Sequence, residues 1–206
     1  KSHELGALVI KEIINRTNLD PKKIDEVIMG QVLTGLTGQN PARQSAISAN
    51  IPIEKTAYVI NQVCGSGLRS VAAAYQSILS NDAKIIIAGG QESMSNSNEE
   101  AMLKDGLIDA YNNYHMGITA ENVAEKWSIS RKEQDNFAFE SQNKTQQAIK
   151  NKKFKEEVIS NFPDEHPRSN VTIQSLSELK PAFKKNGTVT AGNSSGINDG
   201  AAAILL

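Results

Sequence analysis

The first third of the chain shows a hydrophobic pattern that predicts helix, strand, helix and strand. The pattern begins with apolar residues at helical spacing over 5–13 and continues with expected elements at 26–33, 42–50 and 56–63. The first helix is expected to end between Asn18 and Pro21. The second is expected to begin after Asn40 and Pro41, because asparagine is a good N-cap and proline suits the first helical turn.

A further helix and strand complete a strand–helix–strand unit. Residues 68–78 carry apolar side chains at helical spacing, and residues 84–88 form a short apolar run that suits a strand buried on both faces. In such units the crossover is right-handed and ligands gather outside the carboxyl ends of the strands. Cys64 follows the strand 56–63 and is therefore expected at that end of the sheet.

After Gly90 the chain loses its strand patterns. Residues 91–127 are polar or lack period-two alternation, and Ser130 with Glu133 forms the capping-box signature of another helix. We therefore expect a mainly helical inserted domain over 91–185. The layered α/β domain would then comprise residues 1–90 and 186–206.

Composition excludes several classes of protein. A chain of 206 residues is long enough for one sizeable core or for one domain with a large insertion. Its residues are 39% hydrophobic and 22% charged with a formal net charge of −1, so we expect no global attraction to nucleic acid or to an anionic membrane. No apolar stretch is long enough for a membrane span, and one cysteine permits no internal disulfide, which fits a cytoplasmic setting. The single cysteine and the three histidines, His3, His115 and His166, are too few and too scattered for a zinc site, so no metal is expected.

Cys64 is the candidate nucleophile. It lies between the β-branched run 56–60 and the turn Gly65-Ser66-Gly67, which opens a helix. A turn of this kind exposes its residue and directs backbone N–H groups and the helix dipole toward it, which favours a thiolate and would suit an oxyanion. Most free cysteines are instead small buried hydrophobes, and the residues alone leave that interpretation open.

Five stretches of the sequence, taken in order, resemble motifs of the thiolase family and together extend over nearly the whole chain. They are GQNPARQ (38–44), NQVCGSGL (61–68), AGGQESMS (88–95), HMGITAEN (115–122) and GTVTAGNSSGINDGA (187–201). The His-Met-Gly form is most similar to the short-chain, acetoacetyl-CoA branch. The resemblance implies a layered α/β/α fold with a mixed sheet and a mainly helical inserted loop domain.

The resemblance also implies a reaction. Cys64 would attack acetyl-CoA, become acetylated and pass the acetyl group to the α-carbon of a second acetyl-CoA, giving acetoacetyl-CoA and CoA. The amide of Cys64 would be one oxyanion donor. Coenzyme A thioesters are thus expected as substrates, with no permanently bound cofactor. Another condensing enzyme of the thiolase superfamily, or a CoA-binding half without catalysis, stays open as an alternative.

Position by position, the resemblance assigns contacts with the pantetheine arm of coenzyme A to two groups of residues. Leu107, His115 and Met116 would line the pantetheine channel. Ala191 and Ser195 would form its opposite wall, where small residues let a ligand approach the backbone closely. Without the resemblance, several of these residues would be read as core or surface side chains.

The nucleotide end of coenzyme A is assigned to Arg168 and Ser175. A guanidinium stacks on adenine and pairs with phosphate, so Arg168 suits this position. The family's second half carries an activating histidine, an Asn-Glu-Ala segment and a second cysteine, and these motifs are expected outside this sequence. A family segment is missing between Asn98 and Glu99, and the approach to His166 is shortened. The complete enzyme is expected to be a homodimer or homotetramer.

Overall fold

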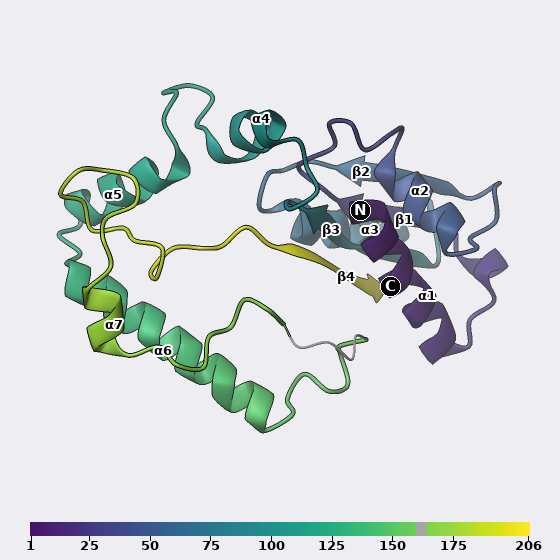
Figure 1. Cartoon of the computed structure of the whole chain (residues 1–206). Coiled ribbons are helices and arrows are strands. Elements are labelled where there is room, and N and C mark those ends of the chain that lie inside the picture. The colour runs from purple at the N-terminus through teal and green to yellow at the C-terminus, as the bar shows by residue number, and fades with distance from the viewer. Residues whose placement is uncertain (160–163) are drawn as a thin grey trace. The chain divides into compact units, whose positions relative to one another are not determined.

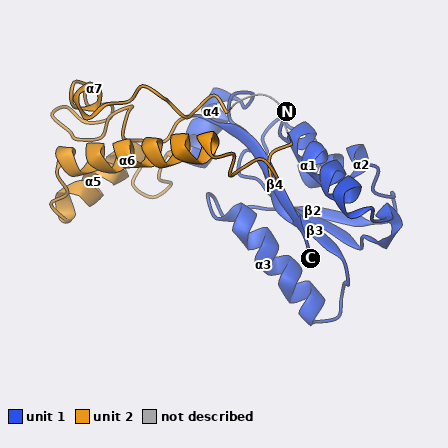
Figure 2. Cartoon of the chain, turned by 90° about the horizontal axis from the view of Figure 1, so that it is seen from below, with its two compact units in different colours: residues 1–106, 197–206 blue, residues 107–196 orange. Residues whose placement is uncertain are grey.

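The structure, a computed structural model, describes residues 1–159 and 164–206 and divides into two compact units. Unit 1 comprises Lys1–Gly106 and Ile197–Leu206, and unit 2 comprises Leu107–Gly196 (Figure 2). The expected inserted domain over 91–185 stays a prediction, since unit 2 begins and ends later in the chain.

Within the described residues, unit 1 contains four strands and three helices of two turns or more (Figure 1). The helices are α1 (Ser2–Thr17), α2 (Pro41–Ser48) and α3 (Ser66–Leu79). The strands are β1 (Glu26–Gly30), β2 (Thr56–Ile60), β3 (Ile86–Ser93) and β4 (Asp199–Leu205). Short helical turns lie at η1 (Pro21–Lys23) and α4 (Glu99–Ala101), and a π-helical turn, η2, spans Met102–Leu107.

The strands form one mixed sheet in the order β2-β1-β3-β4. β1 pairs in parallel with β2 and β3, with Val27 opposite Ala57 on one side and Ile87 on the other. β4 runs antiparallel to β3, with Leu205 opposite Ile87. The mixed sheet expected from the sequence is therefore confirmed.

β1 is buried on both faces because alternate side chains enter two separate cores. Val27 shares one core with Ile10 of α1 and Ala46 of α2. Ile28 shares the other with Ala74 of α3. Accordingly, α1 and α2 cover one face of the sheet and α3 covers the other (Figure 2). The three layers agree with the expected α/β/α arrangement.

β3 differs from the expected strand at 84–88. It begins at Ile86 and continues to Ser93, because β4 pairs with it from Ile87 onward and holds its polar end extended. A Cβ at Gly89 would lie 2.1 Å from the carbonyl oxygen of Ala202, so a side chain has no room there. The expectation that polar residues after Gly90 leave the sheet was wrong.

The start of α3 packs directly on the sheet. A Cβ at Gly30, the last residue of β1, would lie 2.3 Å from the carbonyl carbon of Ser66. A Cβ at Gly90 of β3 would lie 3.3 Å from the Cα of Gly67. Backbone therefore contacts backbone at both glycines, and the first turn of α3 is fixed against two strands.

Unit 2 contains α5 (Met116–Lys126), α6 (Arg131–Lys150) and α7 (Ile173–Ser177). Ser130 and Glu133 form the predicted capping box at the start of α6. Pro163 and Pro167 predict an irregular stretch over 162–170, which lies partly outside the described residues. No helix in the described ranges combines the length and the apolar character that crossing a membrane requires.

Candidate active site

Cys64 lies in the turn between β2 and α3, with its thiol free and exposed. β2 ends at Ile60, and α3 begins at Ser66 with Gly65 as its N-cap. The cysteine is thus placed just before a helix start, at the end of a parallel strand, as expected. The alternative interpretation as a buried hydrophobe is wrong for this structure.

The turn before Cys64 is tight and contains a left-handed residue. Val63 has a φ of 48°, which is uncommon for a β-branched side chain. The amide of Gly65 donates to the carbonyl of Gln62 at 3.1 Å, and the amide of Ser66 donates to the carbonyl of Val63, also at 3.1 Å. Such backbone strain tends to occur at functional sites, where surrounding contacts sustain it.

His115 is the N-cap of α5 and is held in a defined orientation. Its Nδ1 accepts a hydrogen bond from the amide of Gly117 at 2.9 Å. The neutral ring therefore carries its proton on Nε2, which makes Nε2 a donor toward any ligand. Phe183 stacks on the imidazole with the ring centroids 4.9 Å apart. A Cβ at Gly117 would lie 2.1 Å from the Phe183 ring, so only glycine fits beside this stack.

The other two predicted channel residues flank His115 in unit 2. Met116 is the first residue of α5 and is exposed. Leu107 is half-buried at the end of η2, next to Ile108, which forms an antiparallel bridge with His115. The structure therefore brings Leu107, His115 and Met116 into one neighbourhood.

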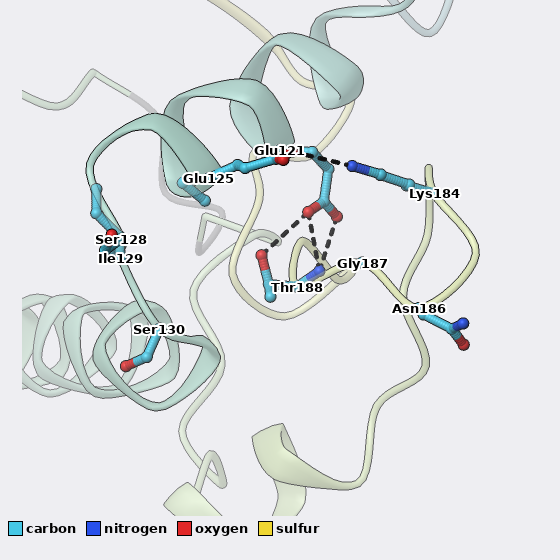
Figure 3. A pocket seen from close by; sticks show the side chains of 10 residues that line it. Glu121, Glu125, Ser128, Ile129, Ser130, Lys184, Asn186, Gly187 and Thr188 are labelled. Atoms are coloured by element: carbon cyan, nitrogen blue, oxygen red, sulfur yellow. Dashed lines mark hydrogen bonds and ion pairs between the residues drawn. The ribbon is translucent and has the colours of Figure 1, made fainter.

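The loop that precedes Ala191 is held by a buried carboxylate. Glu121 of α5 is 4% exposed and accepts a hydrogen bond from the amide of Thr188 at 2.8 Å (Figure 3). It also accepts one from the amide of Val189 at 2.8 Å. Its Oε2 also accepts from the Thr188 hydroxyl at 3.1 Å. Burial raises the pKa of Glu121, but the two amides, the hydroxyl and the charge of Lys184 together lower it below its usual value.

Asn193 fixes the same loop from within. Asparagine in a loop usually satisfies backbone groups, so the sequence predicts a structural role for this residue. Its Oδ1 accepts from the amide of Thr190 at 2.8 Å, and its Nδ2 donates to the carbonyl of Thr188 at 3.1 Å. Nδ2 also donates to the buried Asp135 of α6 at 3.0 Å. Ala191 and Ser195, the predicted opposite wall, are exposed on either side of Asn193.

A short backbone pairing joins this loop to the His115 stack. The amide of Ala182 donates to the carbonyl of Val189 at 2.9 Å, and Pro181 forms an antiparallel bridge with Thr190. Phe183 follows directly and stacks on His115. Two of the predicted groups of coenzyme A contacts are therefore connected through residues 181–183.

Arg168 and Ser175, the predicted nucleotide contacts, are both exposed in unit 2. The amide of Arg168 donates to Gln142 of α6 at 2.9 Å, which ties its backbone to that helix. The Ser175 hydroxyl accepts from the amide of Thr172 at 3.0 Å and donates to the Thr172 carbonyl at 2.9 Å. This hydroxyl is therefore already engaged in the capping box of α7.

An open cavity of about 280 Å³ lies beside Glu121 in unit 2 (Figure 3). Its polar lining includes Ser130, Lys184 and Thr188. None of the contact residues predicted from the sequence is among the residues that line it. The cavity and the predicted coenzyme A contacts are therefore different parts of this unit.

Three residues that organise unit 2 were missed by sequence reasoning: Glu121, Asp135 and Phe183. Each contacts a partner more than fifty residues away in the chain, so no local sequence pattern indicates its role. The one available signal was the presence of an acidic residue, Glu121 or Asp135, on the buried face of a helix. A carboxylate at such a position calls for a buried partner.

A layered α/β unit that exposes a cysteine between a strand and a helix start defines a class of proteins suited to nucleophilic chemistry. Comparison with known families narrows this class. The chain matches the family model "Thiolase, N-terminal domain" over residues 1–102 and 97–206. It belongs to the thiolase family through this domain.

Similar proteins carry a more specific name. Acetyl-CoA acetyltransferases of Paracoccus denitrificans and Rhizobium meliloti are 50% and 49% identical to this chain, and each match covers 100% of the chain and 59% of the relative. The matches extend over 232 residues against 206 here, so the relatives carry residues that this chain lacks within the matched region. The chain spans rather more than half the length of these relatives.

A solved structure supports the fold. The crystal structure of the Bacillus anthracis acetyl-CoA acetyltransferase matches with a TM-score of 0.91 and 33% identity, covering 99% of this chain and 58% of that one. The three-layered arrangement derived above is therefore that of a thiolase N-terminal domain.

Proposed function

We propose that the intact protein is an acetyl-CoA C-acetyltransferase that condenses two acetyl-CoA molecules reversibly to acetoacetyl-CoA and CoA. The observation that carries this proposal is the exposed Cys64 at the β2–α3 turn, in a chain 50% identical to a protein of that name. The His115-Met116-Gly117 sequence favours the short-chain, acetoacetyl-CoA branch of the family.

Cys64 carries the acetyl group between two half-reactions. Its thiolate adds to the carbonyl carbon of acetyl-CoA, and collapse of the tetrahedral intermediate expels the CoA thiolate and leaves acetyl-Cys64. Loss of an α-proton from the second acetyl-CoA gives an enolate, whose carbon attacks the acetyl carbonyl and expels the Cys64 thiolate. The backbone N–H of Cys64 is one donor to the oxyanion. The family resemblance assigns the proton transfers to groups of the second half.

Coenzyme A is recognised by unit 2. Leu107, His115 and Met116 contact the pantetheine arm, with Nε2 of His115 directed to an acceptor on the ligand. Ala191 and Ser195 form the opposite wall of the channel. This assignment is supported by the way residues 181–183 connect the His115 stack to the loop before Ala191.

The adenine nucleotide of coenzyme A lies against Arg168 and Ser175. Arg168 is exposed and its backbone is tied to α6, so its guanidinium is available to phosphate or adenine. No cofactor is held permanently, because the coenzyme A thioesters are the substrates. The active protein is cytoplasmic and forms a homodimer or a homotetramer. Sedimentation velocity of the intact protein measures this oligomeric state.

Mass spectrometry of the intact protein after mixing with acetyl-CoA tests the reaction. The proposal expects one acetyl group, located on Cys64 by peptide mapping, and its transfer to added acetyl-CoA. Cys64→Ala should gain no acetyl group while keeping the far-ultraviolet circular dichroism of the parent. An acetyl group on another residue, or acyl transfer that persists in Cys64→Ala, would refute the proposal.

A further inference from the structure

Val63, the residue immediately before the nucleophile, is held on both sides of its backbone. Its amide donates to Oδ1 of Asn61 at 2.9 Å. Its carbonyl accepts from the Ser66 hydroxyl at 2.5 Å and from the Ser66 amide at 3.1 Å. A left-handed φ of 48° is unfavourable for valine, so these contacts are what maintain it.

Ser66 makes a second contact that closes the turn. Its hydroxyl accepts from the amide of Gln62 at 2.8 Å while donating to Val63, so one side chain joins both residues that precede Cys64. Ser66 is only 4% exposed, so removing its hydroxyl would leave the two backbone groups without these partners in a largely buried position. The direction in which the Cys64 side chain leaves the backbone depends on the torsion angles that this hydroxyl holds.

The other end of the contact is fixed by the sheet. Ser66 is the first residue of α3, and its backbone lies directly against Gly30, the last residue of β1, while the next residue, Gly67, lies against Gly90 within β3. Ser66 therefore cannot move with the turn. Because the Ser66 hydroxyl is hydrogen-bonded to the Val63 carbonyl, Val63 is held in place relative to the sheet. The next residue, Cys64, is thereby held as well.

We propose that Ser66 is a positioning residue for Cys64: its hydroxyl keeps Val63 in the left-handed conformation that directs the thiol toward the start of α3. The role in acetyl transfer rests on the function proposed above. The role in orienting the thiol does not, because reaction of Cys64 with a small electrophile needs no second substrate.

Ser66→Ala in the intact protein tests the proposal against a matched control, Ser70→Ala. Ser70 lies one turn later in α3, is fully buried, and donates from its hydroxyl to the carbonyls of Gly67 and Gly89 at 2.7 and 2.6 Å. Both variants lose one buried hydroxyl from the same helix. A merely structural role predicts similar losses of melting temperature and similar reactivity of Cys64.

The first measurement is the rate of Cys64 alkylation by iodoacetamide under native conditions. Ser66→Ala should react about tenfold more slowly than the parent, the effect of one lost hydrogen bond on an orienting equilibrium. Ser70→Ala should react like the parent. Equal rates for Ser66→Ala and the parent, or equal slowing in both variants, would overturn the proposal.

The second measurement asks whether Ser66 acts through Val63. Glycine adopts a positive φ without strain, so in Val63→Gly the left-handed conformation at residue 63 no longer needs the Ser66 hydroxyl to maintain it. Adding Ser66→Ala to Val63→Gly should then change the alkylation rate by less than about twofold, the ordinary error of additivity. This pair also serves if Ser66→Ala alone fails to fold. A tenfold loss in the glycine background would overturn the mechanism.

The third measurement is acetylation by acetyl-CoA, in which Ser66→Ala should lower kcat and leave KM unchanged because no coenzyme A contact is altered. If the parent is alkylated but never acetylated, the proposed function fails while the alkylation comparison still decides the role of Ser66. If acetylation proceeds and Ser66→Ala raises KM alone, the positioning role fails and the function stands.

Discussion

Glu121 shows how one side chain can fix a loop that is remote in sequence. Its carboxylate accepts from two consecutive amides, those of Thr188 and Val189, and is almost completely buried. Gly187 leaves room for it, since a Cβ there would lie 2.2 Å from the carboxylate. The position of Ala191, in the proposed pantetheine channel, therefore depends on an acid in α5.

Glu121→Gln is expected to destabilise the protein by about 1.5–3 kcal/mol at neutral pH, because hydrogen bonds to a buried charge are replaced by weaker ones. Urea unfolding followed by circular dichroism measures the change. Glu125→Gln, one turn along α5, removes an exposed ion pair with Lys184 at 3.3 Å and should cost less than about 1 kcal/mol. Equal losses in both variants would contradict the role given to Glu121.

The stabilisation by Glu121 should also depend on pH in a definite direction. The pKa of Glu121 is lower in the folded protein than in the unfolded chain, so unfolding takes up a proton as the solution is acidified. The contribution is complete above the unfolded value of about 4.3 and is lost as the pH falls through the lower folded value. The difference in the free energy of unfolding between the parent and Glu121→Gln should therefore shrink below pH ~4. A difference that stays constant with pH would contradict the role given to the ionised carboxylate.

Arg168→Ala is expected to raise KM for acetyl-CoA with little change in kcat. Loss of a charge-assisted contact of about 1.5–3 kcal/mol corresponds to at least a tenfold change in KM. Steady-state kinetics of the intact protein give both constants. Lys144→Ala removes another exposed cation, one that lies 4.0 Å from Glu140 within α6, and should leave both constants unchanged. An unchanged KM in Arg168→Ala would remove it from the nucleotide site.

At the level of single residues, sequence interpretation succeeded where the cause is local. Cys64 was placed correctly because the strand, the glycines and the helix that expose it are all within a few residues of it. The structural role of Asn193 could be predicted because two of its three partners, Thr188 and Thr190, are close in the chain. Glu121 and Phe183 could not be found in this way, since their partners come from other elements of unit 2.

Among the elements, β3 shows the limit of reading strands from composition. Residues 89–93 lack the β-branched and aromatic residues that favour strands, and beyond Gly90, where the pairing with β1 ends, the strand continues because β4 supplies hydrogen-bonding partners. The partner strand comes from the far end of the chain, so no local pattern could reveal it. β1 and β2 were predicted with their correct starts, and both end three residues earlier than expected.

The contact between α3 and the sheet gives a prediction at the scale of elements. Gly30→Ala would force the first turn of α3 away from β1, because the clashing atoms belong to the Ser66 backbone. We expect a loss of about 1–3 kcal/mol in stability together with slower alkylation of Cys64. Gly35→Ala is the control, since its Cβ would lie 3.7 Å from the side chain of Ala101, an ordinary contact. Cys64 alkylation at the parent rate in Gly30→Ala would show that the turn does not depend on this packing.

At the scale of the whole molecule, α3 presents an apolar face that nothing in unit 1 covers. Leu68, Tyr75 and Leu79 share one side of the helix and are between 57% and 78% exposed. Contiguous apolar surface of this kind is uncommon on monomers. The resemblance to thiolases implies that the helices of this half pack against those of the second half, and we expect that second half to cover the exposed face of α3.

Residues 1–206 produced by themselves are therefore expected to self-associate and to show no thiolysis of acetoacetyl-CoA. Light scattering and a thiolysis assay measure the two properties on one sample. Leu68→Lys combined with Leu79→Lys should reduce the self-association, because it places charge on the exposed face. A monomer that catalyses thiolysis would contradict both the expected need for a second half and the assignment of the bases to it.

The pairing of β3 with β4 has a consequence for how the protein is made. During translation β3 leaves the ribosome long before β4, which is synthesised only after the whole of unit 2. Until then one edge of the sheet has unpaired backbone groups, the condition under which nascent chains join wrong partners. The loop that must close before β4 can pair with β3 contains the whole of unit 2, and the entropy cost of closing such a loop grows only slowly with its length. The long insertion therefore delays the pairing of β4 more than it weakens it.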